Sequence, residues 1–128
     1  ADLDQNEKAI ECYQKAIEIK PDNVKVLYSL GWNYLLLYDL ANAEQYLLKT
    51  WALTENKHAH ASMNLGHIHL LRDAPDKALD FYKTSLHLFE DKEAFFQGMD
   101  SDYTDLNMQT HHIPRETYDA ILAELKNS

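Results

Sequence analysis

The chain has 128 residues and a formal net charge of −9, from 12 Lys and Arg against 21 Asp and Glu. This excess of acid argues against nucleic acid or an anionic membrane as the main partner, because both reward clustered positive charge. No apolar run approaches the roughly 18 residues of a membrane span, and no secretory signal is visible at the start. The single Cys12 leaves no internal disulfide and fits a reducing compartment, so we expect a cytoplasmic protein.

Apolar residues recur at helical spacing along the whole chain, and no segment alternates as a strand would. The run Pro21-Asp22-Asn23 ends one helix and starts the next, and Pro75 suits the first turn of another. The sequence therefore predicts an all-α fold of about seven helices, over residues 5–19, 22–37, 40–53, 58–71, 75–88, 91–109 and 114–126.

Two short motifs recur at a fixed period within these helices. The motif Leu-Gly-x2-Tyr begins at residue 30 and returns as Leu-Gly-x2-His 35 residues later. A second motif, Ala-x3 followed by Tyr or Leu, begins at residues 9, 43 and 78, in steps of 34 and 35. A period of this size predicts a stacked array of helix pairs, because one pair cannot bury its own apolar face.

The glycine of the first motif has a physical reason to be there. Gly31 inside a helix costs on the order of 1 kcal/mol relative to alanine. We expect the missing side chain to let the next helix approach closely, with Ala43 as the small facing surface and Leu47 filling the space one turn further on.

These motifs resemble the tetratricopeptide repeat family, whose pattern is W-x2-L-G-x2-Y, then A-x3-F, then P, over about 34 residues. The central copy reads Leu27-x2-Leu30-Gly31-x2-Tyr34, then Ala43-x3-Leu47. The resemblance implies a right-handed superhelical array of antiparallel helix pairs. We predict one domain over 1–128, divided into a half repeat (1–23), two repeats (24–57 and 58–92), a divergent half repeat (93–110) and a C-terminal capping helix (111–128).

We expect the two ends of the array to differ in how much apolar surface they expose. The chain begins in the middle of a repeat, so it is expected to be either a piece of a longer array or a chain whose first helix exposes apolar surface. Ile10, Tyr13 and Ile17 are the candidates for that surface, and a homo-oligomer through this half repeat would cover them. At the other end Ile121 and Leu125 form an apolar stripe that suits a cap.

In this family the first helix of each pair lines the concave side, and the resemblance therefore implies a binding groove there. The corresponding stripe is rich in Tyr, Trp, Met and His, where a solvated face would carry Glu, Lys and Arg. Trp and Tyr are favoured interface anchors, and Met adapts to varied partners. The alternative is that these side chains pack against neighbouring first helices. The predicted partner-binding residues are Lys25, Tyr28, Trp32, Leu35, His60, Met63, Asn64, His67 and Gln97.

Chaperone-binding members of the family clamp a C-terminal carboxylate with Lys, Arg and Asn side chains. The corresponding places here hold Tyr28, Trp32, Asn64, Ala94 and Gly98, of which only Asn64 matches. We therefore expect an extended peptide with apolar or aromatic anchors, and no carboxylate clamp.

Catalytic and metal chemistry find little support. His60 and His67 share a helix face but stand two turns apart, about 10 Å, with no carboxylate between them at ligand spacing. No glycine-rich phosphate loop and no nucleophile motif occurs. No cofactor, metal site or catalytic residue is therefore predicted.

The sequence thus predicts a non-catalytic protein–protein interaction module that binds a peptide or protein segment in its concave groove. Two alternatives stay open: a scaffolding or regulatory segment of a larger multidomain enzyme, and an assembly module that self-associates through its N-terminal end. The groove itself is either open or filled by the C-terminal segment around residues 106–113.

Overall fold

The computed structural model describes residues 3–108 and 113–128, and over these residues the chain is helical without strands. Each predicted helix corresponds to an observed one, with ends that differ by two residues at most, and the all-α fold class is confirmed. The helices are α1 (Leu3–Ile19), α2 (Val24–Leu36), α3 (Leu40–Leu53), α4 (Ala59–Leu71), α5 (Pro75–Leu88), α6 (Lys92–Met108) and α7 (Arg115–Lys126).

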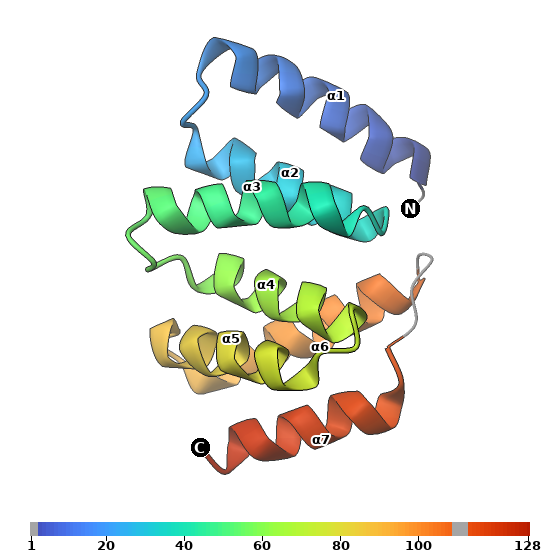
Figure 1. Ribbon diagram of the computed structural model, residues 1–128, viewed down its shortest axis with the longest axis vertical. Coiled ribbons are helices and arrows are strands. Elements are labelled where there is room, and N and C mark those ends of the chain that lie inside the picture. The colour runs from blue at the N-terminus through green and yellow to red at the C-terminus, as the bar shows by residue number, and fades with distance from the viewer. Residues whose placement is uncertain (1–2, 109–112) are drawn as a thin grey trace.

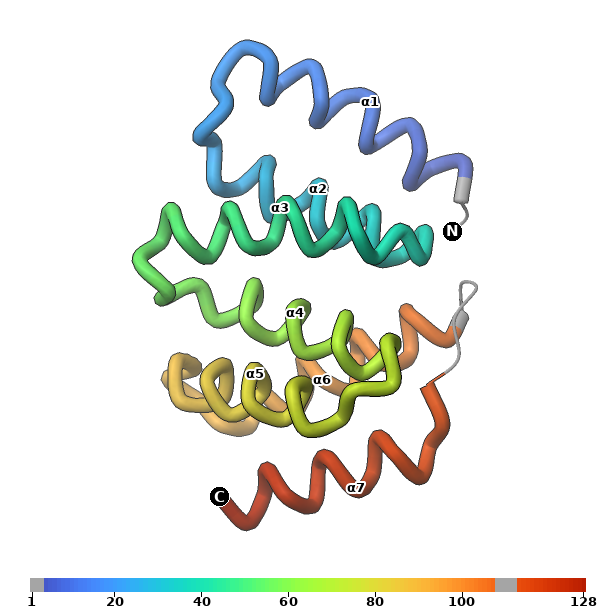
Figure 2. Tube along the Cα trace, viewed as in Figure 1, coloured from blue at the N-terminus to red at the C-terminus, as the bar shows by residue number. Residues whose placement is uncertain are grey.

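The helices form a stack with α1 at one end and α7 at the other (Figure 1). Successive helices from α1 to α5 pack on one another, and α7 packs on α5. Figure 2 shows the same path as a continuous trace. Helix α6 departs from this simple order, because it contacts α2 as well as α5. No helix in the described ranges is long and apolar enough to cross a membrane.

Side chains fix the start of three helices by accepting a hydrogen bond from an otherwise unpaired backbone N–H. Asn23 Oδ1 accepts from the amide of Val26 at 3.2 Å, and Asp39 Oδ1 accepts from that of Asn42 at 3.2 Å. His58 Nδ1 plays the same part for α4, 3.0 Å from the amide of Ala61. These three turns therefore have a fixed geometry from which the next helix starts.

The turns within the two repeats are built alike, 35 residues apart. Tyr38 and Asp73 both adopt the left-handed conformation, with φ of 62° and 61°. The residue after each donates its amide to a carbonyl one turn back, that of Tyr34 at 2.9 Å and that of His69 at 2.8 Å. This pattern satisfies carbonyl groups that a helix end leaves unpaired.

The repeated spacing of a glycine and a bulky residue holds each helix pair together. A Cβ placed on Gly31 would lie 2.6 Å from Leu47 Cγ, and one on Gly66 would lie 2.5 Å from the ring of Tyr82. Both distances are shorter than carbon atoms allow, so only glycine fits at either place. The close approach expected at Gly31 is confirmed.

Helix α4 is the centre of the molecule. Every residue from 61 to 68 is buried, including those on the side that the repeat pattern would leave for solvent. Two serines connect it to α5: Ser62 Oγ donates to the carbonyl of Phe81, and Ser85 Oγ to that of Ala59, each at 2.8 Å. A helix covered on all sides must satisfy its polar groups internally, and these bonds do so for the hydroxyl of Ser62 and the carbonyl of Ala59.

Helix α7 closes the far end of the stack. Ile121 and Leu125 belong to the main hydrophobic core, as the apolar stripe predicts. Tyr118 joins α7 to α6, since its ring stacks on Tyr103 with centroids 4.2 Å apart and its hydroxyl donates to Asp100 Oδ1 at 2.6 Å. Burial, the hydrogen bond and the charge of Asp100 raise the pKa of Tyr118, so the hydroxyl keeps its proton.

Candidate interaction surface

The structure separates the predicted partner-binding residues into two groups. Lys25, His60 and Gln97 are exposed, and Tyr28 and Trp32 are half-buried against the core. These five remain accessible to a partner.

The other four are inside the protein, and the prediction that they line a groove is wrong. Leu35, Met63 and Asn64 are 0% exposed, and His67 is 2% exposed. A partner cannot reach them without displacing a helix. The alternative, that these side chains pack against neighbouring helices, describes them correctly.

The cover over α4 is helix α6. His67 Nε2 on α4 lies 2.9 Å from Asp102 Oδ2 on α6. Gly98 of α6 comes so close to α4 that a Cβ there would touch the end of Met63 at 3.4 Å. The described cover therefore comes from the body of α6, residues 92–108; residues 109–112, within the segment 106–113, lie outside the described part of the chain.

This contact is part of a hydrogen-bonded row of three side chains, in which Tyr82 and His67 are buried and Asp102 is partly exposed. His67 Nδ1 lies 2.7 Å from the hydroxyl of Tyr82, and the opposite ring nitrogen faces Asp102. Burial raises the pKa of Tyr82 well above its usual value, with smaller contributions from Tyr118 and Asp102, so its hydroxyl stays protonated. The carboxylate of Asp102 can only accept, so Nε2–H donates to it, and in the neutral imidazole this leaves Nδ1 to accept from the Tyr82 hydroxyl.

A Tyr–His–Asp row resembles a proton relay, but its setting is structural. Tyr82 is fully buried, so no substrate can approach the oxygen at the end of the row. The row instead joins α4, α5 and α6 through one imidazole. In the described residues, moreover, no group of three His, Cys, Asp or Glu side chains is placed to hold a metal ion.

The single position that matches a carboxylate clamp is also buried. Asn64 Nδ2 donates to the hydroxyl of Tyr28 at 3.2 Å, while Asn64 Oδ1 has no hydrogen-bond partner among the described residues. Burial, then the charge of Asp102, raises the pKa of Tyr28 to about 12 against a smaller lowering by this hydrogen bond. Asn64 is thus engaged with α2 and does not face a ligand.

Next to the face of α4 that α6 covers, a row of rings lies along the N-terminal end of α4. Tyr28 stacks on His58 at 5.0 Å and meets His60 edge-on at 6.3 Å. His60 in turn contacts Phe89 at 5.0 Å, and Phe89 contacts Phe95 of α6 at 5.5 Å. We call the four residues Tyr28, His58, His60 and Phe89 the aromatic edge.

Sequence reasoning missed His58 and Phe89, because both flank helices rather than occupy them. His58 precedes α4 and Phe89 follows α5. Helical periodicity carries no information about the direction of residues in a turn. Their only sequence signal was the aromatic character of the turns themselves.

The N-terminal expectation also needs correction. Ile10, named as a candidate for exposed apolar surface, is only 9% exposed, whereas Tyr13 and Ile17 are half-buried. The residue that extends into solvent is Ile19, at 87%. The reason is that α1 turns its Ile10 side toward α2 and ends in the loop before it.

The fold defines the chain as a helical-repeat protein. Residues 1–43 match a family model described as TPR repeat, which confirms the resemblance to that family. The chain is also similar to the BBSome complex member BBS4 of Mus musculus, with 32% identity over 84 residues. That match covers 66% of this chain and 16% of the mouse protein's length.

Proposed function

We propose that this chain is a non-catalytic binding module that takes part in a protein assembly, with the aromatic edge as its docking surface. The observation that carries the proposal is the row of rings from Tyr28 to Phe89, in which His60 is exposed and the other three are half-buried, beside the face of α4 that α6 covers. Aromatic side chains bring large contact area at low entropic cost, which is why they anchor interfaces.

Because α6 covers the face of α4 beside the aromatic edge, only some kinds of partner can bind there. With Met63, Asn64 and His67 buried, a peptide cannot be inserted deeply between α2 and α6. A shallow contact along the edge remains, with the cation of Lys25 one helical turn before Tyr28. This favours a partner segment with an apolar or aromatic anchor and an acidic neighbour over a clamped C-terminal carboxylate.

The comparisons with known proteins also support a role in protein binding. A TPR repeat suggests protein–protein interaction, and the mouse relative is by name a member of a complex. The proposal has four parts: the chain takes part in an assembly, it is not catalytic, it is cytoplasmic, and it forms one domain with two full repeats. Two alternatives remain with it: a regulatory segment of a larger enzyme, and self-association through α1, which exposes Ile19.

The test is a peptide-library selection on the wild-type chain, followed by fluorescence anisotropy with the selected peptides. The edge variant is Lys25→Glu with His60→Glu, both exposed positions. The control is Lys49→Glu with Gln45→Glu, which makes the same charge change on exposed positions of α3. Circular dichroism checks that both fold.

We expect the edge variant to lose binding about tenfold or more, equivalent to about 1.4 kcal/mol, and the control to bind like wild type. Equal binding by both variants would remove the aromatic edge as the site. A concentration-dependent doubling of mass that Ile19→Lys abolishes would favour the self-association alternative.

A further inference from the structure

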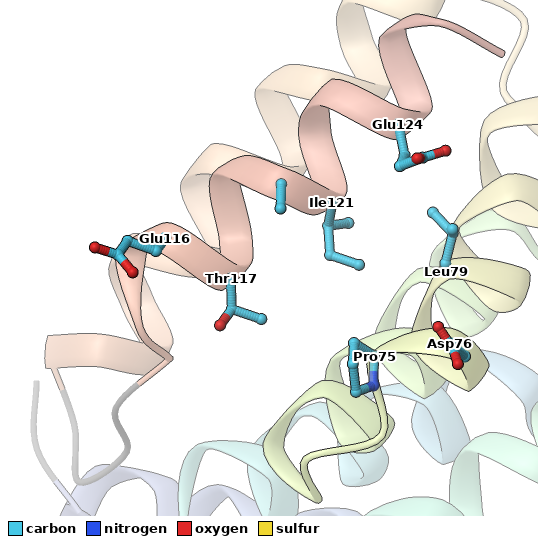
Figure 3. Close-up of a pocket in the computed structure, with 8 residues that line it drawn as sticks. Pro75, Asp76, Leu79, Glu116, Thr117, Ile121 and Glu124 are labelled. Carbon is cyan, nitrogen blue, oxygen red and sulfur yellow. The ribbon is translucent and has the colours of Figure 1, made fainter.

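A second concave feature lies away from the aromatic edge, between α5 and α7. It is a cleft of about 510 Å³, within the size range of ligand pockets. Thr117 and Ile121 of α7 face Pro75 and Leu79 of α5 across it (Figure 3). The lining residues are Pro75, Asp76, Leu79, Glu116, Thr117, Ala120, Ile121 and Glu124.

The floor of this cleft is apolar. Leu79 and Ile121 supply branched side chains from the two walls, and Ala120 leaves space between them because its side chain is a single methyl group. Leu79 is only half-buried, so part of its apolar surface faces the cleft and water. Burying that surface under a partner's apolar group is favourable.

The margin of the cleft is acidic and uncompensated. Asp76, Glu116 and Glu124 are the charged residues of the lining, and no Lys, Arg or His accompanies them there. Within residues 3–108 and 113–128, none of the three carboxylates takes part in a hydrogen bond or ion pair. Three like charges around an apolar floor make a complementary surface for cations.

Helix stability explains two of these carboxylates but not the third. Asp76 and Glu116 lie in the first turns of α5 and α7, where negative charge is favoured by the helix dipole. Glu124 lies near the C-terminus of α7, where the same dipole opposes it. The helix dipole therefore does not account for the charge of Glu124 at the cleft.

The α7 wall of the cleft is held by contacts to the rest of the protein. Tyr118 attaches α7 to α6 through the bond to Asp100, and Leu125 is buried in the core. Glu116 and Glu124 are eight residues apart on α7, about 12 Å along the helix axis, at opposite ends of that wall (Figure 3). A rigid site binds without the entropic cost of ordering itself.

We infer that this cleft is a docking site for a segment of a partner protein that carries one large apolar side chain with Lys or Arg on both sides of it. The apolar side chain enters between Leu79 and Ala120, and the cations meet Glu116 and Glu124. The site is distinct from the aromatic edge and uses the opposite charge preference, since Lys25 at that edge favours acidic partners.

The probe is a short fluorescent peptide with one central Phe flanked on each side by Lys and Arg, titrated with the full chain. Two matched peptides accompany it, one with Ser in place of Phe and one with Glu in place of every basic residue. Backbone NMR shifts locate the bound probe. We expect binding by the first peptide only, shifts at α5 and α7, and weakening with added salt.

Two pairs of variants then test the cleft itself. Glu116→Lys with Glu124→Lys reverses the margin, and Glu7→Lys with Glu55→Lys makes the same charge change at exposed positions elsewhere. Ala120→Trp fills the floor, and Ala123→Trp adds the same bulk at an exposed position of α7 outside the lining. We expect each cleft variant to weaken binding about tenfold or more, and each control to leave it unchanged.

Several outcomes would overturn the inference. These are equal binding of the acidic peptide, shifts confined to other helices, or no binding at all. A dimer that Ala120→Trp disrupts would also do so, because the occupant would then be a second copy of this chain. The double variant of Lys25 and His60 should keep full affinity for the probe, so failure of the proposed function can be told apart from failure here.

Discussion

His67 and Asp102 meet at 2.9 Å although 35 residues separate them in the sequence. This one contact joins the most buried helix, α4, to the helix that covers it, α6. Without it the imidazole would keep its bond to Tyr82 and lose the partner of its other nitrogen. The pair is one of the contacts by which α6 covers a face of α4 that was predicted to line the groove.

Removing the Asp102 carboxylate should therefore destabilise the fold. Asp102→Ala leaves a buried N–H of His67 without an acceptor, which costs about 1–3 kcal/mol. Asp102→Asn keeps an acceptor oxygen and should cost less. Urea denaturation of the three proteins measures the difference, with Asp105→Ala, at an exposed position of the same helix, as the control. If the alanine variant of Asp102 unfolds at the wild-type midpoint, the pair does not hold α6 in place.

Substitution by alanine should change the stability of the protein differently at Gly66 and at Gly98. Gly66→Ala forces a methyl group against the fully buried ring of Tyr82, and we expect a loss of about 1–3 kcal/mol despite the better helix propensity. At Gly98 the nearest atom is the flexible end of Met63, at 3.4 Å. Gly98→Ala should then be neutral or stabilising by up to about 1 kcal/mol. Thermal or urea unfolding distinguishes them, and a reversed order would contradict the packing described.

Stability should fall as the solution is acidified through the range of histidine titration. Burial lowers the pKa of His69, and the charges of Arg72 and Lys77 add to this against the opposing charge of Glu44. A group whose pKa is lower in the folded state takes up protons more readily when unfolded. Its contribution is thus present above the unfolded pKa, about 6.5, and is lost as the pH falls below it.

The measurement is the urea midpoint of wild type and His69→Gln between about pH 7.5 and pH 5.5. The variant should show a smaller decrease over this interval, whereas His87→Gln, at an exposed position, should follow the wild type. Parallel curves for all three proteins would mean that His69 does not contribute to the acid sensitivity.

The bond between Tyr28 and Asn64 should be measurable as a coupling. Tyr28→Phe removes the one partner of a buried amide whose oxygen is already unpaired, and should cost about 1–3 kcal/mol. In a double-mutant cycle with Asn64→Ala, the two losses should be less than additive by about 0.5–1.5 kcal/mol. Additive losses would show that the two side chains do not interact in solution.

The helices and their pairing were predictable because their causes are local or periodic. Gly31 and Leu47 recur as Gly66 and Tyr82 at a step of 35, and the same contact results in both copies. Caps such as Asn23 act within four residues of themselves. Nothing distant in the chain has to be known to place these elements.

The binding face was only partly predictable, because it depends on where α6 lies. The faces of α4 that carry Met63 and His67 look like a groove lining until another helix is packed on them. In α6 the repeat motif has decayed, and the register that placed Gln97 on the concave side gave no signal that Asp102 faces His67. The sequence therefore did not predict this contact.

The contact of α6 with α2 has a consequence for how the molecule comes apart. In an ideal array each repeat touches only its neighbours, so unfolding proceeds as a row of separable units that can fray from either end. Here α6 contacts α2, although three helices lie between them in the sequence. Loss of α6 uncovers α2 and α4 together. We therefore expect the stack to melt in a single concerted transition, and a chain shortened before Lys92 to lose far more than the share of its missing residues.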